Sequence, residues 1–207
     1  MPARHKILIL SILVMIFCGG GKEQKITIQK SEEKVVPATK SVLIIIAPKD
    51  FRDEEFKEPY DLLTTSGIKV IIASTDTLPA KGMLGTVVKP QILLSQVIPD
   101  SFNALVIVGG TGCKVLWDDT MLHTIVQNFE QNHKTIAAIC IAPVVLARAG
   151  VLKNKKATVY PGVAGEIKPH CAEYTAMDVE ISGNTITGSG PQAAKDFAKA
   201  ILEVLSK

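Results

Sequence analysis

Cys140 lies at the boundary between a strand-like segment and a helix-like segment. Residues 135–139 (TIAAI) form a short apolar run typical of a buried strand, and Pro143 opens a segment with a helical pattern. Cys140 lies in the turn between them. A side chain on such a turn points out of the sheet and lies at the positive end of the next helix, which lowers the pKa of a thiol. The pattern predicts a nucleophile elbow with Cys140 as the nucleophile.

A tight elbow favours small neighbouring residues, and this turn meets that need only in part. Ala137, Ala138 and Ala142 are small, whereas Ile141, directly after the cysteine, is not. The alternative interpretation is a structural cysteine in the core, because free cysteines are among the most buried residues. On chemistry alone both interpretations stay open.

Two other features could bear on the same site. A strand-like run ends in Gly109–Gly110, and Cys113 follows this pair by three residues. Cys113 is either a resolving thiol for an oxidised Cys140 or a bystander. The chain has four cysteines but no CxxC and no paired Cys/His spacing, so we expect no metal site and no cofactor.

The elements that must position these residues alternate along the chain. We expect buried strands at 41–47, 68–74, 104–110, 135–139 and 156–160, a hairpin at 179–189, a small excursion at 82–97, and helices at 53–66, 117–132, 143–149 and 191–205. Such alternation predicts a mostly parallel sheet covered by helices on both faces. Ligands bind outside the carboxyl ends of the strands in such sheets, where Gly109–Gly110 and Cys140 both lie.

Composition limits the classes of function. The chain of 207 residues is 47% hydrophobic, which is enough for one domain with a substantial core, expected over 41–207. Its net charge is only +3 and its basic residues are scattered, so we expect no nucleic-acid partner.

The N-terminus has the pattern of an export signal. A basic start precedes an apolar run at 7–17 that is shorter than the roughly 20 residues of a membrane span. Cys18 follows, and then glycines, as in a bacterial lipoprotein signal, although Phe17 is larger than the residue usual before the cysteine. We expect residues 1–18 to be the signal, Cys18 to be lipidated, and the polar residues 19–40 to tether an exported domain to the membrane. The alternatives are an uncleaved anchor, or a cytoplasmic protein whose start is wrongly assigned.

Several motifs in order resemble the ThiJ/PfpI superfamily, which includes the parkinsonism-associated deglycase and the PfpI-type intracellular peptidases. The resemblance runs from about residue 41 to the C-terminus and includes EFKEPYDLLTTSGIKVIIAS, ALVIVGGTG, AAICIAPVVLARAGVL, VYPG and ITGSGP. It implies the class I glutamine amidotransferase-like fold, a flavodoxin-like three-layer α/β sandwich with a nucleophile elbow.

The resemblance also implies roles for particular residues. Cys140 takes the place of the nucleophile, and Glu55, four residues before Pro59, takes the place of the acid that hydrogen-bonds the thiol. Gly110 and Thr111, together with the residue after the nucleophile, Ile141, take the place of the backbone groups that face the reacting oxygen. An acid beside a thiolate must hold a proton, so it can relay protons. Without the resemblance, Glu55 would be interpreted as a solvated helix residue.

The sequence departs from both branches of the superfamily. The peptidase branch has a histidine directly after the nucleophile, where this chain has Ile141, and the deglycase branch has a histidine where this chain has Tyr160. Tyr160 can hydrogen-bond but is a poor base at neutral pH. Arg52 is expected near the cleft, where it either attracts an anion or is an ordinary surface residue, and His170 is a further candidate for the cleft.

Three hypotheses of function remain. The first is a cofactor-independent enzyme in which Cys140 attacks a small reactive carbonyl, as in a glyoxalase or deglycase, or an amide-type bond, as in a PfpI-like peptidase. The second is a stress or chaperone-like protein in which Cys140 senses oxidation. The third is an anchored binding domain with a vestigial thiol. The resemblance implies a homo-oligomer, with a dimer as the simplest case.

Overall fold

The structure is a computed structural model that describes residues 40–207. The predicted signal, Cys18 and residues 19–39 of the predicted tether lie outside the described residues. Within the described range, no helix combines the length and the apolar character that a membrane span requires.

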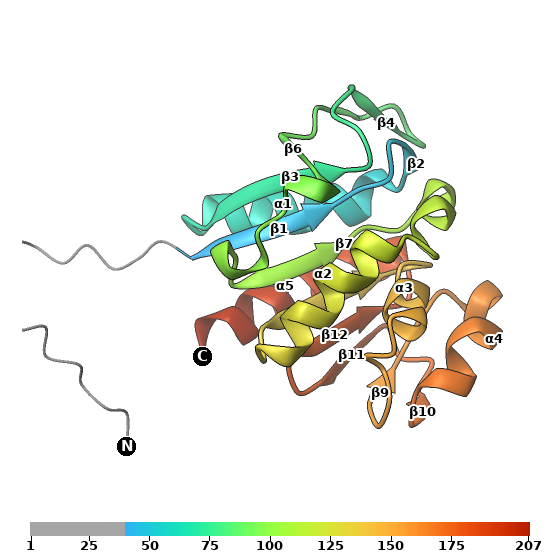
Figure 1. Ribbon diagram of the computed structural model, residues 1–207. Helices are drawn as coiled ribbons and strands as arrows, with labels where there is room; N and C mark the ends of the chain where they lie inside the picture. The colour runs from blue at the N-terminus through green and yellow to red at the C-terminus, as the bar shows by residue number, and fades with distance from the viewer. Residues whose placement is uncertain (1–39) are drawn as a thin grey trace, which may run out of the picture. The chain divides into compact units, whose positions relative to one another are not determined.

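A seven-stranded sheet forms the centre of the fold (Figure 1). Its order is β11 (Val179–Ser182), β12 (Thr185–Gly188), β8 (Thr135–Ile139), β7 (Ala104–Ile107), β1 (Ser41–Ile45), β3 (Lys69–Ser74) and β6 (Ile92–Leu93). Neighbouring strands are parallel except β11, which is joined to β12 by a tight turn at Gly183 and runs antiparallel to it. The inner strands β1, β7 and β8 are buried along almost their whole length, as strands covered on both faces must be.

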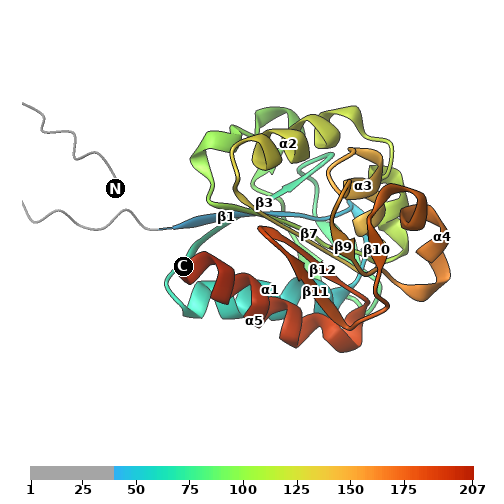
Figure 2. The same cartoon turned by 90° about the horizontal axis from the view of Figure 1, so that it is seen from below.

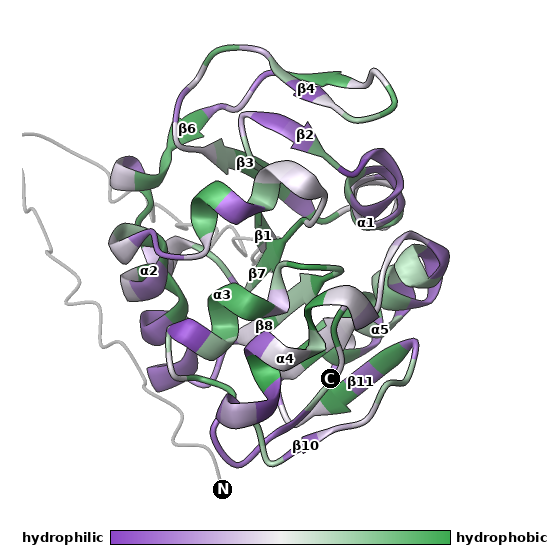
Figure 3. Cartoon of the chain, turned by 90° about the vertical axis from the view of Figure 1, so that its right-hand side faces the viewer, coloured by the Kyte–Doolittle hydropathy of each residue, from purple (hydrophilic) through white to green (hydrophobic). Residues whose placement is uncertain are grey.

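Helices cover both faces of this sheet (Figure 2). One face carries α1 (Asp53–Thr65) and α5 (Ala194–Ser206), which pack against each other, and the other carries α2 (Thr120–Gln131) and α3 (Pro143–Arg148). Figure 3 shows the inner strands β1 and β7 as hydrophobic and the outer turns of α1 and α2 as hydrophilic. The three-layer, flavodoxin-like α/β class expected from the sequence is confirmed.

Local signals explain where the helices begin and end. The Asp119 side chain caps α2 by accepting a hydrogen bond of 2.8 Å from the Leu122 amide, so this helix begins at Thr120, within the segment 117–132 that was expected to be helical. Gly67, with φ +77°, follows the end of α1. Pro191 opens a 3-10 turn, and α5 itself begins only at Ala194.

Smaller elements lie beside the main sheet. The excursion at 82–97 supplies β6 and part of a second sheet, formed by β2 (Lys49–Phe51), β4 (Ala80–Gly82) and β5 (Val87–Val88). The expected strand at 156–160 is wrong in extent, because only β9 (Lys156–Ala157) is a strand and it pairs with β10 (Glu173–Tyr174), outside the main sheet. The short helix α4 is Ala164–Ile167, and the 3-10 turns are Leu94–Gln96, Pro99–Ser101, Thr111–Leu116, Pro161–Val163, Lys168–His170 and Pro191–Ala193.

Candidate active site

Cys140 lies on a strained turn between β8 and α3. Its φ is +63°, in the left-handed region that costs an L-residue about 1–2 kcal/mol. Two backbone hydrogen bonds hold the turn: the Cys140 amide donates to the Gly188 carbonyl at 2.9 Å, and the Tyr160 amide donates to the Cys140 carbonyl at 2.8 Å. The residue is only 9% exposed. The surrounding backbone therefore fixes where the sulfur lies.

The glycine pair after β7 packs against this turn and against the start of α1. A Cβ on Gly109 would lie 2.6 Å from Cys140 Cβ and 2.6 Å from Glu55 Oε2. Gly110 has φ +94°, and a Cβ there would lie 2.4 Å from the Arg52 amide nitrogen. Only glycine fits at either position. The absence of side chains at 109 and 110 lets the cysteine and the acid approach each other.

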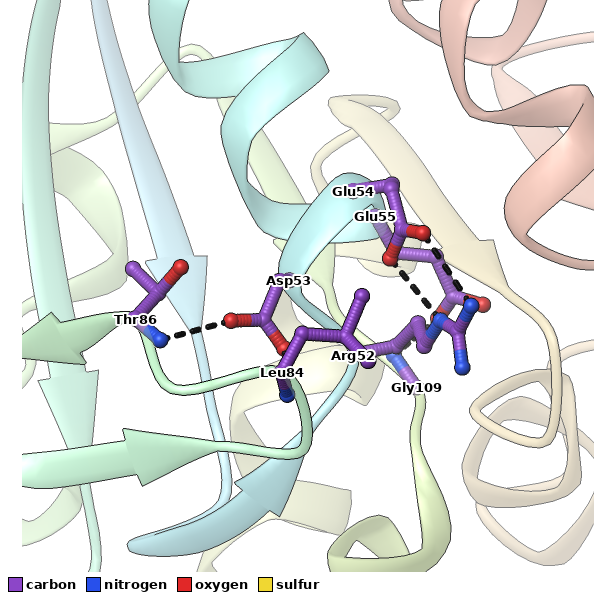
Figure 4. A network of polar contacts seen from close by, with 7 residues as sticks. All are labelled: Arg52, Asp53, Glu54, Glu55, Leu84, Thr86 and Gly109. Carbon is purple, nitrogen blue, oxygen red and sulfur yellow. Dashed lines mark hydrogen bonds and ion pairs between the residues drawn. The ribbon is translucent and has the colours of Figure 1, made fainter.

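Glu55 brings a buried carboxyl to the sulfur from the first turn of α1. It is fully buried, and its Oε2 accepts a hydrogen bond of 3.1 Å from the Gly109 amide (Figure 4). Its Oε1 has no hydrogen-bond partner of normal geometry among the described residues, although the carboxyl and the Cys140 thiol are close enough to shift each other's pKa. A buried oxygen without a partner costs free energy unless it is protonated or binds a ligand.

Burial raises the pKa of Glu55 from its ordinary value of 4.5 to about 7. The thiol of Cys140, the Gly109 amide and the Arg52 guanidinium oppose this rise by stabilising the carboxylate, and the neighbouring Glu54 adds to it. At neutral pH the Glu55 side chain is therefore divided between its acid and its carboxylate, which is the condition for moving protons in either direction.

The sequence-based expectation of a lowered thiol pKa is wrong. Burial raises the pKa of Cys140 to about 12, and the negative charge of Glu55 is the second cause. The amides of Gly110 and Ile141 oppose this rise but do not overcome it, and α3 has only six residues, which limits its dipole. A thiolate consequently forms when Glu55 takes the thiol proton, and not by loss of the proton to water.

Both groups open into one cavity of about 470 Å³ at the carboxyl ends of β7 and β8. Seven residues singled out in the sequence line it: Arg52, Glu55, Gly110, Thr111, Cys140, Ile141 and Tyr160.

Cys113 does not line this cavity and is fully buried, which raises the pKa of its thiol. His170 is exposed and lies outside the cavity. Within residues 40–207, no group of three or more His, Cys, Asp or Glu side chains is placed to hold a metal ion.

The cavity also contains residues that sequence reasoning missed: Met83, Lys114, Gly162, Val163, Pro191 and Gln192. Asp53, a buried residue at the start of α1, holds the segment that follows Met83. Asp53 accepts hydrogen bonds from the Leu84 amide at 2.7 Å and the Thr86 amide at 2.8 Å (Figure 4). The start of α1 thus supplies the acid Glu55 and also fixes one wall of the cavity.

Arg52 and Tyr160 occupy different positions at the cavity. The Arg52 guanidinium is bound to Glu54 by two hydrogen bonds, Nε to Oε2 at 2.8 Å and Nη2 to Oε1 at 3.1 Å (Figure 4). Tyr160 is 48% exposed, and a Cβ on Gly162 would lie 2.8 Å from its ring. Arg52 therefore has its charge already balanced, whereas Tyr160 presents a ring and a hydroxyl to solvent.

A mostly parallel α/β sheet, with a cysteine on a strand-to-helix turn beside a buried acid, defines the class of this protein. The model of the DJ-1/PfpI family matches residues 40–204, and the chain belongs to this family. The resemblance inferred from the motifs is thereby confirmed.

Curated relatives are similar over most of their length. An uncharacterized protein of Methanocaldococcus jannaschii is 44% identical over 80% of this chain and 82% of its own. A glutathione-independent glyoxalase of Caenorhabditis elegans is 30% identical over 81% of this chain and 90% of its own. A deglycase of Pyrococcus horikoshii is 30% identical over 79% of this chain and 98% of its own.

Solved structures show the same fold. The crystal structure of a ThiJ/PfpI domain protein from Brachyspira murdochii superposes with a TM-score of 0.79 at 33% identity. The match covers 81% of this chain and 97% of that one.

Proposed function

We propose that this protein is a cysteine-dependent enzyme that converts small 2-oxoaldehydes to 2-hydroxy acids without a cofactor. One observation carries the proposal: the Cys140 sulfur and the Glu55 carboxyl, whose pKa burial raises to about 7, face one open cavity. Relatives named as a glyoxalase and as a deglycase support the same chemistry.

The two side chains can complete such a reaction between them. Glu55 takes the thiol proton, the Cys140 sulfur bonds to the aldehyde carbon, and the aldehyde oxygen receives the proton. Glu55 then removes the proton from that carbon, which gives an enediolate, and the proton on the former aldehyde oxygen moves to the neighbouring oxygen. Glu55 returns its proton to the neighbouring carbon, which gives a thioester of the 2-hydroxy acid. Water cleaves the thioester and restores the thiol. The sum is addition of one water molecule, so no external oxidant or reductant is needed.

The negative charge that develops on the substrate oxygen needs hydrogen-bond donors. The amides of Gly110 and Ile141 already act on the Cys140 sulfur, as their effect on its pKa indicates. Backbone amides fixed at such a position stabilise an oxyanion without reorganising. Thr111 lines the same cavity and is the third candidate for this role.

Two other chemistries at the same sulfur have less support. A peptidase needs a general acid to protonate the leaving amine, and Ile141 stands where the peptidase branch has a histidine. Oxidation sensing is favoured by one observation, the protonatable Glu55 beside the sulfur, because an acid can donate a hydrogen bond to a sulfinate. We keep oxidation sensing as the second candidate function.

A direct assay separates these functions. The described domain is incubated with methylglyoxal and lactate is measured, with Cys140→Ala and Glu55→Gln as controls. We expect lactate from the wild type and none above background from Cys140→Ala. Equal lactate from both would remove the enzymatic proposal. Titration with peroxide, followed by intact mass, then tests sensing, which requires Cys140 to gain oxygen before Cys171 does.

The location and the assembly of the protein are separate proposals based on the sequence. We propose that Cys18 is lipidated and anchors the domain outside the cytoplasm, and that the domain forms a homo-oligomer. The mass of the mature N-terminus tests the first proposal, since an unmodified Met1 would contradict it. Sedimentation velocity tests the second.

A further inference from the structure

The active-site cavity is much larger than methylglyoxal requires. Its volume of about 470 Å³ equals that of about 16 water molecules, at about 30 Å³ each. Pockets of this size usually bind ligands with many more atoms than a three-carbon aldehyde. The part of the cavity beyond Cys140 and Glu55 is therefore available for the rest of a larger substrate.

Two cations, Arg52 and Lys114, line this cavity, and among the described residues only Arg52 is paired with a carboxylate. Arg52 is bound to Glu54, and Arg148, which stacks over the Trp117 ring at 5.1 Å, is bound to Asp118 at 2.6 Å and to Glu166 at 2.9 Å. Lys114 lines the cavity from the turn after Gly110, and its Nζ lies 5.9 Å from the centroid of the same Trp117 ring.

Lys114 makes no ion pair with any residue in the range 40–207, and its side chain is exposed. In the same cavity, Oε1 of the buried Glu55 has no hydrogen-bond partner of normal geometry among the described residues. The cavity thus contains an unpaired carboxyl oxygen of Glu55, close to the Cys140 sulfur, and the unpaired ammonium group of Lys114 on its wall.

We propose that the substrate carries a carboxylate remote from its reacting carbonyl, and that Lys114 binds this carboxylate. The assignment rests on the proposed function and adds the substrate class to it. A carboxylate fits better than a phosphate, because one unpaired ammonium matches a single negative charge, whereas phosphate sites usually combine several donors. Lys114 contacts a part of the substrate that does not react, so it contributes to binding throughout the reaction.

Two aryl glyoxals of nearly equal size test this proposal. The first, 4-carboxyphenylglyoxal, carries the charge, and the second, 4-carbamoylphenylglyoxal, is its neutral isostere. In the wild type we expect kcat/KM to be about tenfold higher for the charged compound, as for one charge-assisted contact in a cleft open to solvent. Lys114→Gln removes this preference through KM with kcat unchanged, and Lys114→Arg keeps most of it. Lys153→Gln, an exposed lysine outside the cavity, serves as the control.

Equal kcat/KM values for the two compounds in the wild type would overturn the proposal, as would a preference that survives in Lys114→Gln. Binding to Cys140→Ala, measured by calorimetry, keeps the test independent of turnover. If no glyoxal is converted, the proposed function fails, and calorimetry still decides whether Lys114 selects the carboxylate. Tighter binding of the charged compound that is lost in Cys140→Ala/Lys114→Gln supports the proposal, and equal binding contradicts it.

Discussion

The amide of Gly109 donates a hydrogen bond to Oε2 of Glu55 at 3.1 Å, in a space that no side chain on residue 109 could share. A Cβ there would lie 2.6 Å from both Glu55 Oε2 and Cys140 Cβ. The end of β7 therefore keeps the acid and the thiol adjacent, and the chemistry proposed for this site depends on that spacing.

The first prediction concerns Gly109 itself. We expect Gly109→Ala to abolish lactate formation and to lower the free energy of unfolding by about 1–3 kcal/mol, the usual range for overpacking a core. Gly165→Ala is the matched control, because a Cβ on Gly165 meets nothing within 4 Å. Urea unfolding and the lactate assay measure both effects. Wild-type activity in Gly109→Ala would contradict this account of the site.

The raised pKa of Glu55 predicts how stability depends on pH. The folded protein binds the Glu55 proton more tightly than the unfolded chain does, since the pKa rises from 4.5 to about 7. The resulting contribution of the Glu55 proton to the free energy of unfolding is fully present below pH 4.5 and is lost as the pH rises through 7. Between pH 4.5 and 8 we expect the free energy of unfolding of the wild type to fall by about 3 kcal/mol relative to that of Glu55→Gln. Parallel unfolding free energies for the two proteins, from urea titrations across this range, would contradict the prediction.

The pairing of Glu55 with Cys140 predicts the pH dependence of catalysis. Below pH 7 both Glu55 and Cys140 hold their protons, and above it the two groups share one proton, which is the form that can attack a carbonyl. We expect kcat/KM to rise with pH with a midpoint of about 7 and then to remain level through pH 9. A rise that begins only above pH 9 would indicate that the thiol loses its proton to water without help from Glu55.

The left-handed backbone of Cys140 predicts an unusual order of stability. Cys140→Ala and Cys140→Gly both remove the sulfur, so neither forms lactate. The glycine variant adopts φ +63° without the steric cost that alanine has, so we expect it to be more stable than the alanine variant by about 1 kcal/mol. At an ordinary helical or strand position the order is reversed. Thermal unfolding of the two variants measures the difference.

Asp53 is predicted to act on substrate binding without contacting the reacting atoms. Asp53→Asn replaces one of the two acceptor oxygens with an amide, so the Leu84 or the Thr86 amide loses its partner. We expect a loss of about 1–2 kcal/mol in the free energy of unfolding and a higher KM, because Met83 forms part of the cavity wall. Asp61→Asn, on the exposed face of α1, is the control. A lower kcat with an unchanged KM would contradict this role.

The sequence alone determined the architecture and the position of the cysteine. Apolar runs such as 41–45 and 135–139 predict strands buried on both faces because their periodicity leaves no polar side, and Pro143 and Gly67 mark helix ends through local backbone preferences. These signals are local, so they can be recognised without coordinates. The short strand at β9 was misjudged because pairing depends on a partner strand that the local pattern does not reveal.

Only the tertiary structure decided the electrostatics of the site. The sequence predicts a lowered pKa for Cys140, and the local pattern alone indicates a solvated Glu55. Cys140 instead has a raised pKa and Glu55 is fully buried, because burial depends on segments far away in the chain. Lys114 and Met83 join the cavity for the same reason, since nothing in their local sequence places them beside Cys140. A local pattern fixes where a backbone turns, but the packing of distant segments fixes how much water surrounds a charge, and solvation by that water sets the pKa.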